Sequence, residues 1–207
     1  MEYQYKTFYK YSEFIDYMVK EEDLTSLLPD REFVLELLKK LEVPYSVRRH
    51  SLQVAEIAID IANKIKGAKV DKKLVEIGAL LHDIGRVSTH GFGHAFMGGK
   101  ILRKRRFPEE LARICERHIL GGLDKEDAKS VGLPEKDFYP VTLEEKIVCL
   151  ADKLTDKSGQ ISVNTSISKL INKRFQIWFN KYGKSQILLK GKERIEKIQK
   201  EVEDLMQ

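Results

Sequence analysis

The feature that most constrains the fold is the recurrence of apolar residues every three or four positions along much of the chain. Val54, Ile57, Ile61 and Ile65 keep this spacing across the segment 46–66, and it is the period of an amphipathic helix. Segments that alternate apolar and polar residues around a tight-turn dipeptide, the pattern of a β-hairpin, are not found. We therefore predict an all-α fold.

Helix starts are indicated by residues that can accept hydrogen bonds from free backbone N–H groups. Asp30 precedes a predicted helix at 31–42 and is expected to cap it alone, because the third residue on is Phe33 rather than Glu or Gln. Thr142 is followed three residues later by Glu145, which predicts a reciprocal capping box. Other helices are expected from Asp71 to the turn at 82–85, from His94 to 105, and from Pro108 to the glycines at 121–122.

Three parts of the chain are distinguished by composition and periodicity. Residues 1–30 are rich in Tyr and Phe without a clean period, which favours an appended N-terminal arm or helix. Residues 31–160 are expected to form a helical-bundle domain, and residues 161–207 a C-terminal helical extension that packs on it. This extension is expected to hold two helices separated near Gly183 or Gly191. The last helix is amphipathic and is a candidate homodimer interface.

Composition excludes several classes of protein. The chain is 42% apolar and 33% charged, which excludes both a disordered chain and a membrane bundle. Runs approaching the ~20 apolar residues that span a bilayer are absent, and the N-terminus lacks the apolar core of a signal peptide. Cys115 and Cys149 match no disulfide framework, so we expect a cytoplasmic protein without a membrane partner. The net charge of +5 favours an anionic partner only weakly.

The candidate metal-ligating residues are mainly histidines. Four of the five are predicted at helix ends or on core-directed helix faces, and two aspartates accompany them: His50, His82, His94 and His118, with Asp83 and Asp152. A buried imidazole must find a hydrogen-bond partner or a metal ion. Imidazole and carboxylate together suit Zn, Mn, Fe or Co. The adjacent His82 and Asp83 can share one centre if the helix ends there, and Gly85 supports such an end.

Three segments carry a family resemblance. RRHSLQVAEIAIDIA, LLHDIGR and ADKL resemble the HD phosphohydrolase superfamily, named for its His-Asp doublet, of which HDIG is a recognised variant. The resemblance covers roughly residues 31–156 and places the ordered ligand series on His50, His82, Asp83 and Asp152. The stretch LLKKLEVPYSVRRHS is similar to an archaeal-type branch of small stand-alone HD proteins. The fold that this resemblance implies is an HD-domain helical bundle.

Two further histidines separate the subtypes of this superfamily. Dinuclear members, such as diadenosine tetraphosphate and cyclic-di-GMP hydrolases, insert two histidines between the doublet and the last aspartate, and His94 and His118 resemble them. The resemblance thus implies two divalent ions, of Fe, Mn, Co, Ni or Zn. His90 is expected to be a polar loop residue, with a ligand role in place of His94 as the alternative.

The activity implied by the resemblance is hydrolysis of a phosphoester of a nucleotide or related small molecule by metal-activated water. Asp83 would bridge the ions and orient the water. Arg86 and Lys153 occupy positions that are usually basic in the superfamily, and each is expected to hold a phosphate oxygen. The expected partner is therefore a small phosphorylated, nucleotide-like substrate.

Other functions stay open at this point. One is a 2′,3′-cyclic phosphodiesterase acting on a pterin or an RNA end, another is a dinuclear-iron HD oxygenase, and a third is a regulatory module without catalysis. The basic run from Lys100 to Arg106 has few interleaved aromatic residues, so a nucleic-acid partner stays open but is unsupported by the sequence. Substrate and metal are left undetermined, because the pocket depends on the loops at 86–93 and 119–141 and several ions accept N/O ligands.

Overall fold

The structure is a computed structural model that describes residues 27–155 and 166–207. Within these residues every regular element is helical, so the all-α prediction is confirmed. The elements, in chain order, are α2 (Arg31–Lys40), α3 (Tyr45–Lys64), α4 (Lys72–Leu81), the 3-10 helix η1 (Ile84–Val87), α5 (Gly93–Lys104), α6 (Glu109–Arg117), the 3-10 turn η2 (Ile119–Gly121), α7 (Lys125–Ser130), α8 (Leu143–Leu154), α9 (Ile167–Tyr182) and α10 (Gln186–Asp204). Most of the expected N-terminal arm, residues 1–26, lies outside the described residues.

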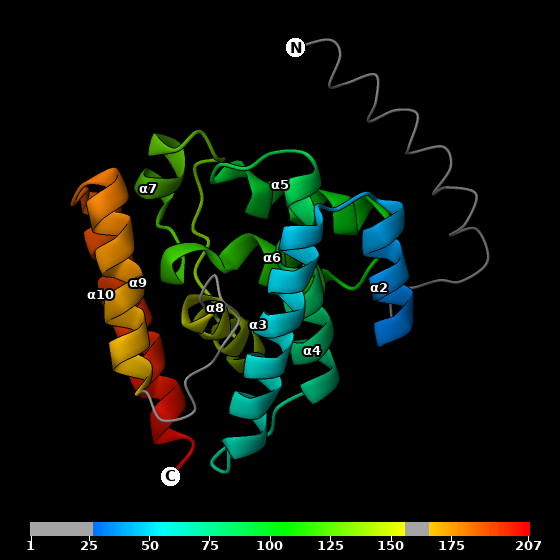
Figure 1. Ribbon diagram of the computed structural model, residues 1–207, viewed down its shortest axis with the longest axis horizontal. Helices are drawn as coiled ribbons and strands as arrows, with labels where there is room; N and C mark the ends of the chain where they lie inside the picture. Colours follow the sequence, from blue (N-terminus) through cyan, green and yellow to red (C-terminus); the bar gives the residue numbers. More distant parts are fainter. Residues whose placement is uncertain (1–26, 156–165) are drawn as a thin grey trace.

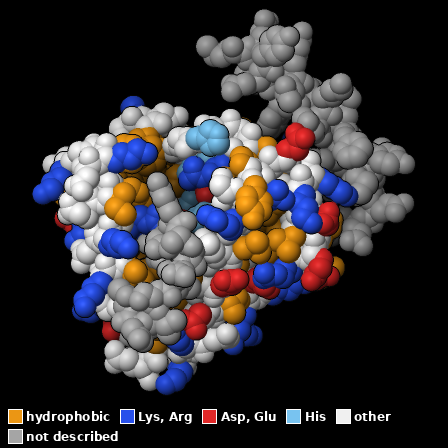
Figure 2. Space-filling view, viewed as in Figure 1, with side chains coloured by type: hydrophobic (Ala, Val, Ile, Leu, Met, Phe, Trp, Pro, Cys, Tyr) orange, Lys and Arg blue, Asp and Glu red, His pale blue; other side chains and the backbone are white. Residues whose placement is uncertain are grey.

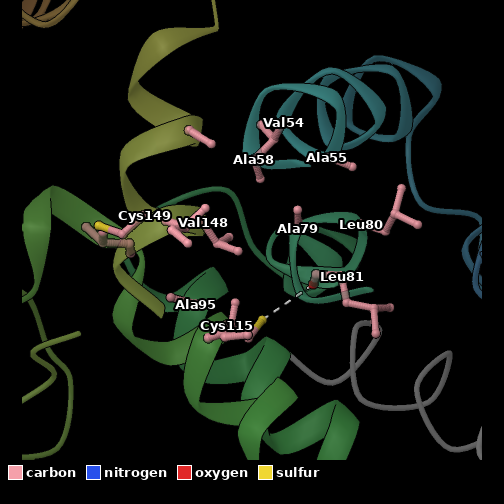
Figure 3. Packing of buried hydrophobic residues seen from close by; sticks show 14 of the residues in the cluster. Val54, Ala55, Ala58, Ala79, Leu80, Leu81, Ala95, Cys115, Val148 and Cys149 are labelled. Carbon is pink, nitrogen blue, oxygen red and sulfur yellow. Dashed lines mark hydrogen bonds between the residues drawn. The ribbon is translucent and has the colours of Figure 1, made fainter. Parts of the chain in front are cut away.

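Helix α8 lies at the centre of the bundle and touches helices on two sides. It packs against α3, α4 and α6, and also against α9 and α10 (Figure 1). Its residues Ile147, Val148 and Leu150 are completely buried. Figure 3 shows small residues such as Ala58 and Ala79 where α3 and α4 face each other. Small side chains allow α3 and α4 to approach each other closely. Both helices also pack on α8, so residues that are distant in sequence come together there.

The approach of α5 to the turn after α4 depends on one glycine. A Cβ atom on Gly85 would lie 1.9 Å from the carbonyl oxygen of His94 and 2.5 Å from the backbone nitrogen of Gly98. The backbone of α5 therefore rests directly on η1, and only a residue without a side chain fits between them. This contact brings the first turn of α5 beside residues 82 and 83.

The C-terminal helices separate at Gly183. This residue adopts a φ of 76°, in the left-handed region that favours glycine at a helix end. The alternative break at Gly191 is wrong, since Gly191 lies inside α10. A Cβ atom on Gly191 would lie 2.9 Å from Cβ of Leu120, so this glycine serves the close packing of α10 on η2.

The two predicted helix caps have different outcomes. Thr142 and Glu145 form the reciprocal capping box at the start of α8, as predicted. Asp30 occupies the N-cap position of α2 but makes no capping hydrogen bond, so that prediction is wrong. Its carboxylate instead accepts a hydrogen bond from Lys73 Nζ at 3.0 Å. The division of the chain at residues 30 and 160 stays a prediction.

Among the described helices, none combines the length and the apolar composition of a membrane span. Within the basic run that follows His94, Arg103 forms ion pairs with Glu109 and Glu116. Part of the positive charge of this run is therefore balanced by acidic side chains.

Gly85→Ala is expected to lower the free energy of unfolding by about 2 kcal/mol or more, because the methyl group meets the backbone of α5, which can move aside only if the whole helix shifts. Urea denaturation measures the change. Gly91→Ala is the matched control, because a Cβ atom there meets nothing within 4 Å. Equal stability of the two variants would contradict the packing described for η1 and α5.

Candidate metal centre

Six side chains from five helices meet in the interior of the bundle. His50 comes from α3, His82 and Asp83 from the end of α4, His94 from α5, His118 from the end of α6 and Asp152 from the last turn of α8. They form overlapping groups of three whose ligand atoms all lie within 4.8 Å of one another. The structure thus brings together all six residues that the sequence singled out.

Three of the histidines are oriented in the same way. The Nδ1 atom of each lies 2.6–2.7 Å from the carbonyl oxygen three residues earlier, namely of Ala79 for His82, of Gly91 for His94 and of Cys115 for His118. Since a carbonyl only accepts, Nδ1 must donate its proton. The lone pair of each ring is then on Nε2, which points into the cluster. This is the arrangement in which metal-bound histidines are usually held.

Asp83 lies between two pairs of histidines. Its Oδ2 atom is 3.9 Å from His50 Nε2 and 3.7 Å from His82 Nε2. Its Oδ1 atom is 2.9 Å from His94 Nε2 and 3.6 Å from His118 Nε2. The two carboxylate oxygens therefore face two different sets of ligand atoms.

The last member of the cluster completes the first of these sets. Asp152 Oδ1 lies 2.9 Å from His50 Nε2 and 3.8 Å from His82 Nε2. The side chains of His50 and Asp152 are 27% and 16% exposed, whereas the other four are at most 6% exposed. The cluster is therefore open to solvent mainly on the side of His50 and Asp152.

The donor set fits bound cations. His94 Nε2 and His118 Nε2 lie 3.2 Å apart, and with both protons on Nδ1 these atoms present two lone pairs to each other. Among the described residues, His82 Nε2 and Asp83 Oδ1 are buried without a hydrogen-bond partner. Buried acceptors that face one another are unfavourable unless a positive charge lies between them. Imidazole nitrogen and carboxylate oxygen suit divalent transition metals.

The pKa values of these groups favour the forms that bind metal. Burial lowers the pKa of His82 and holds that of His118 well below its usual range, so both rings are neutral. Burial acts to raise the pKa of Asp152, but the Lys153 ammonium group, His50 and His82 together outweigh burial and hold that pKa well below normal. Asp152 is therefore ionised at neutral pH.

The two predicted phosphate-binding cations are both in contact with the cluster. Arg86 Nε donates to Asp83 Oδ2 at 2.6 Å, and the side chain is 29% exposed. Lys153 is only 4% exposed, forms an ion pair with Asp152 and donates to the carbonyl oxygen of His118 at 3.1 Å. The Arg86 side chain is thus partly exposed to solvent, whereas Lys153 is buried against the cluster.

The sequence did not single out the side chains that support the cluster from outside. Thr155 Oγ1 lies 3.4 Å from His50 Nδ1 and donates to the carbonyl oxygen of Asp152 at 2.9 Å. Its position three residues after Asp152 is a signal that could have identified it. The buried thiols of Cys115 and Cys149 contact the carbonyl oxygens of His82 and His118. Burial raises the pKa of Cys149 to about 11, which keeps it protonated.

The fifth histidine lies outside the cluster. His90 is exposed in the loop before α5, and its carbonyl oxygen accepts a hydrogen bond from Arg86 Nη1 at 3.3 Å. His94, in contrast, is buried with Nε2 facing Asp83. The geometry therefore favours His94 over His90 as the ligand from this segment.

Comparison with known proteins places this arrangement in a family. The family profile described as the HD domain matches residues 47–156, which include all six clustered residues. The chain belongs to the HD-domain family. It is thus a member of the HD superfamily of metal-dependent phosphohydrolases, which the quoted segments indicated.

Individual relatives of this HD protein are found in archaea. It is 47% identical over 140 residues to an uncharacterized protein of Methanocaldococcus jannaschii, covering 67% of this chain and 82% of that one. It is 39% identical over 150 residues to a tRNA (cytidine(56)-2′-O)-methyltransferase of Picrophilus torridus, covering 72% of this chain. The match spans only 43% of that methyltransferase.

Among solved structures, the PgpH HD domain of L. monocytogenes in complex with cyclic-di-AMP is similar to the HD protein at 19% sequence identity. The TM-score is 0.47, and the match covers 84% of this chain and 97% of that chain.

The stability of the metal-free HD protein is expected to fall as the pH is lowered from 7 to 5. The unfolded chain takes up protons on His82 and His118 near pH 6.5, whereas the folded chain keeps both neutral. Each histidine contributes at most about 1.4 kcal/mol per pH unit. Urea denaturation in the presence of a chelator measures the change.

The control for this pH dependence uses the exposed histidine. His118→Asn should reduce the loss of stability between pH 7 and 5, whereas His90→Asn should leave it unchanged. A metal-free protein that is equally stable at both pH values would contradict the neutral, buried state of these rings.

Proposed function

We propose that this HD protein is a phosphohydrolase with a dinuclear metal centre, which cleaves a phosphoester of a nucleotide or related small molecule. The observation that carries the proposal is the position of Asp83, whose two carboxylate oxygens face two separate pairs of histidine nitrogens. A carboxylate placed in this way can bridge two cations. The identity of the metal is left to experiment, since Fe, Mn, Co, Ni and Zn all accept these ligands.

The residues around the proposed centre have distinct tasks. Bound divalent ions would supply charge to the phosphoryl oxygens and lower the pKa of water. Asp83 and the five other clustered residues hold the ions, and the backbone carbonyls fix the imidazoles in one tautomer. Arg86, accessible beside Asp83, binds a phosphate oxygen of the substrate. Lys153 positions Asp152 and the carbonyl of His118 rather than contacting substrate.

A second candidate is hydrolysis of a 2′,3′-cyclic phosphate at an RNA end. The observation that favours it is the similarity of 72% of this chain to 43% of a tRNA (cytidine(56)-2′-O)-methyltransferase. The same six ligands serve either ester, so the substrate must be found by experiment. Two measurements distinguish hydrolysis from the alternative of a dinuclear-iron oxygenase. An oxygenase would consume oxygen together with its substrate, whereas a hydrolase is expected to act with Mn²⁺ under anaerobic conditions.

A phosphate-release screen tests the proposal. Nucleotides and cyclic phosphates are supplied with Mn, Fe, Co or Ni, and we expect turnover of at least one of them. His82→Ala and Asp83→Asn should each lower the rate by more than about a hundredfold, which exceeds the loss typical of outer-shell partners. His90→Ala, at the exposed histidine, should keep the wild-type rate. Full activity of the His82 and Asp83 variants would place the reaction elsewhere.

Metal content tests the number of ions separately from activity. We expect two Mn²⁺ ions per chain in the wild type and one in His94→Ala, because that substitution removes a ligand from only the Oδ1 side of Asp83. Elemental analysis after dialysis measures the ratio, with His90→Ala as the control that keeps two. A ratio of one in the wild type would show that Asp83 does not bridge.

A further inference from the structure

A side chain of the C-terminal extension reaches the edge of the proposed metal centre. Arg174 of α9 lies outside the residues matched by the family profile. Its Nη2 atom donates to Thr155 Oγ1 at 3.3 Å, and the same oxygen lies 3.4 Å from His50 Nδ1. This is the side on which the cluster is open to solvent, since His50 is its most exposed member. Arg174 is thus placed beside the entrance.

The guanidinium group of Arg174 is held in position by aromatic packing. Its central carbon lies 5.8 Å from the ring centroid of Trp178, one helical turn further along α9. The Trp178 ring in turn packs edge-on against the buried Phe175, with centroids 5.0 Å apart. An arginine that stacks on a fixed ring is already ordered, so less conformational entropy is lost when it binds an anion.

Among the described residues, carboxylates balance the charge of Arg174 less than they balance the charges of Arg86 and Lys153, the other two cations at the centre. Arg86 and Lys153 each pair with a carboxylate of the cluster. Within residues 27–155 and 166–207, the hydrogen bond of Arg174 goes to a neutral hydroxyl, and no carboxylate forms an ion pair with it. A guanidinium group has five N–H donors, so this one can still bind an anion through several of them.

The position of Arg174 determines which part of a bound substrate the guanidinium group can contact. Thr155 and His50 stand between Arg174 and the central Asp83. A phosphoryl group held at Asp83 is therefore in reach of Arg86, whereas Arg174 is in reach of a group attached further out, toward solvent. On the face shown in Figure 2, Lys and Arg side chains are numerous, with Asp and Glu side chains among them.

We propose that Arg174 binds a second anionic group of the substrate, a phosphate other than the one that is hydrolysed, and thereby favours nucleotides with two or more phosphates over monophosphates. This inference rests on the proposed function for the phosphoryl group at the centre. The planar fork of arginine matches two phosphate oxygens at once, which a lysine cannot do.

Calorimetric binding to the Mn²⁺-loaded protein tests this role without turnover. The probes are a methylene-bridged diphosphate, which has two phosphorus groups, and inorganic phosphate, which has one. Arg174→Gln should weaken binding of the diphosphate by about tenfold or more, as expected for a lost hydrogen bond to a charged group, and leave phosphate binding within about twofold. Arg174→Lys should give an intermediate loss. Lys173→Gln, on the exposed face of the same helix, should bind both probes like the wild type.

The outcomes separate this inference from the proposed function. Equal weakening of both probes by Arg174→Gln, together with less Mn²⁺ per chain, would overturn it, because Arg174 would then act only by positioning His50 through Thr155. Unchanged diphosphate affinity would also overturn it, while phosphate release by the wild type would still support the proposed function. Selective loss of diphosphate binding supports the inference even if the screen finds no hydrolysed ester.

Discussion

The structure depends on the hydrogen bonds that fix three imidazole rings to their own backbone. Each ring donates Nδ1–H to the carbonyl three residues earlier, and each therefore turns its Nε2 lone pair toward the Asp83 carboxylate. In a buried cluster these acceptors repel one another unless a cation lies between them. The interior of the bundle is accordingly organised for positive charge, and the proposal of a dinuclear metal centre follows from that requirement.

Helix ends make this arrangement possible. His82 and His118 are the C-cap residues of α4 and α6, and His94 lies in the first turn of α5. A residue at a helix end can turn its side chain inward while its neighbours leave the helix, so adjacent residues such as His82 and Asp83 can face one centre. Gly85 completes the geometry, since its missing side chain lets α5 rest on the turn that carries Asp83.

The predictions from sequence succeeded where a local pattern decides the structure. The helical period of the apolar residues and the Thr142 capping box are local, and both are borne out. Asp30 failed as a cap because Lys73, distant in sequence, competes for its carboxylate. Gly191 was wrongly offered as a helix break, because its role is contact with Leu120 and not backbone freedom. Both errors come from tertiary partners that periodicity does not reveal.

The sequence by itself determined the helical class and the set of chemically unusual residues: few histidines, an adjacent His-Asp pair, and a later aspartate on a helix. These are properties of residue type and spacing. Only the tertiary structure decided that Asp83 faces two histidine pairs, that Lys153 is buried against Asp152, and that α9 places Arg174 beside His50. Such relations depend on how separate helices pack, because the distances between side chains on different helices are set by the core and not by any one segment.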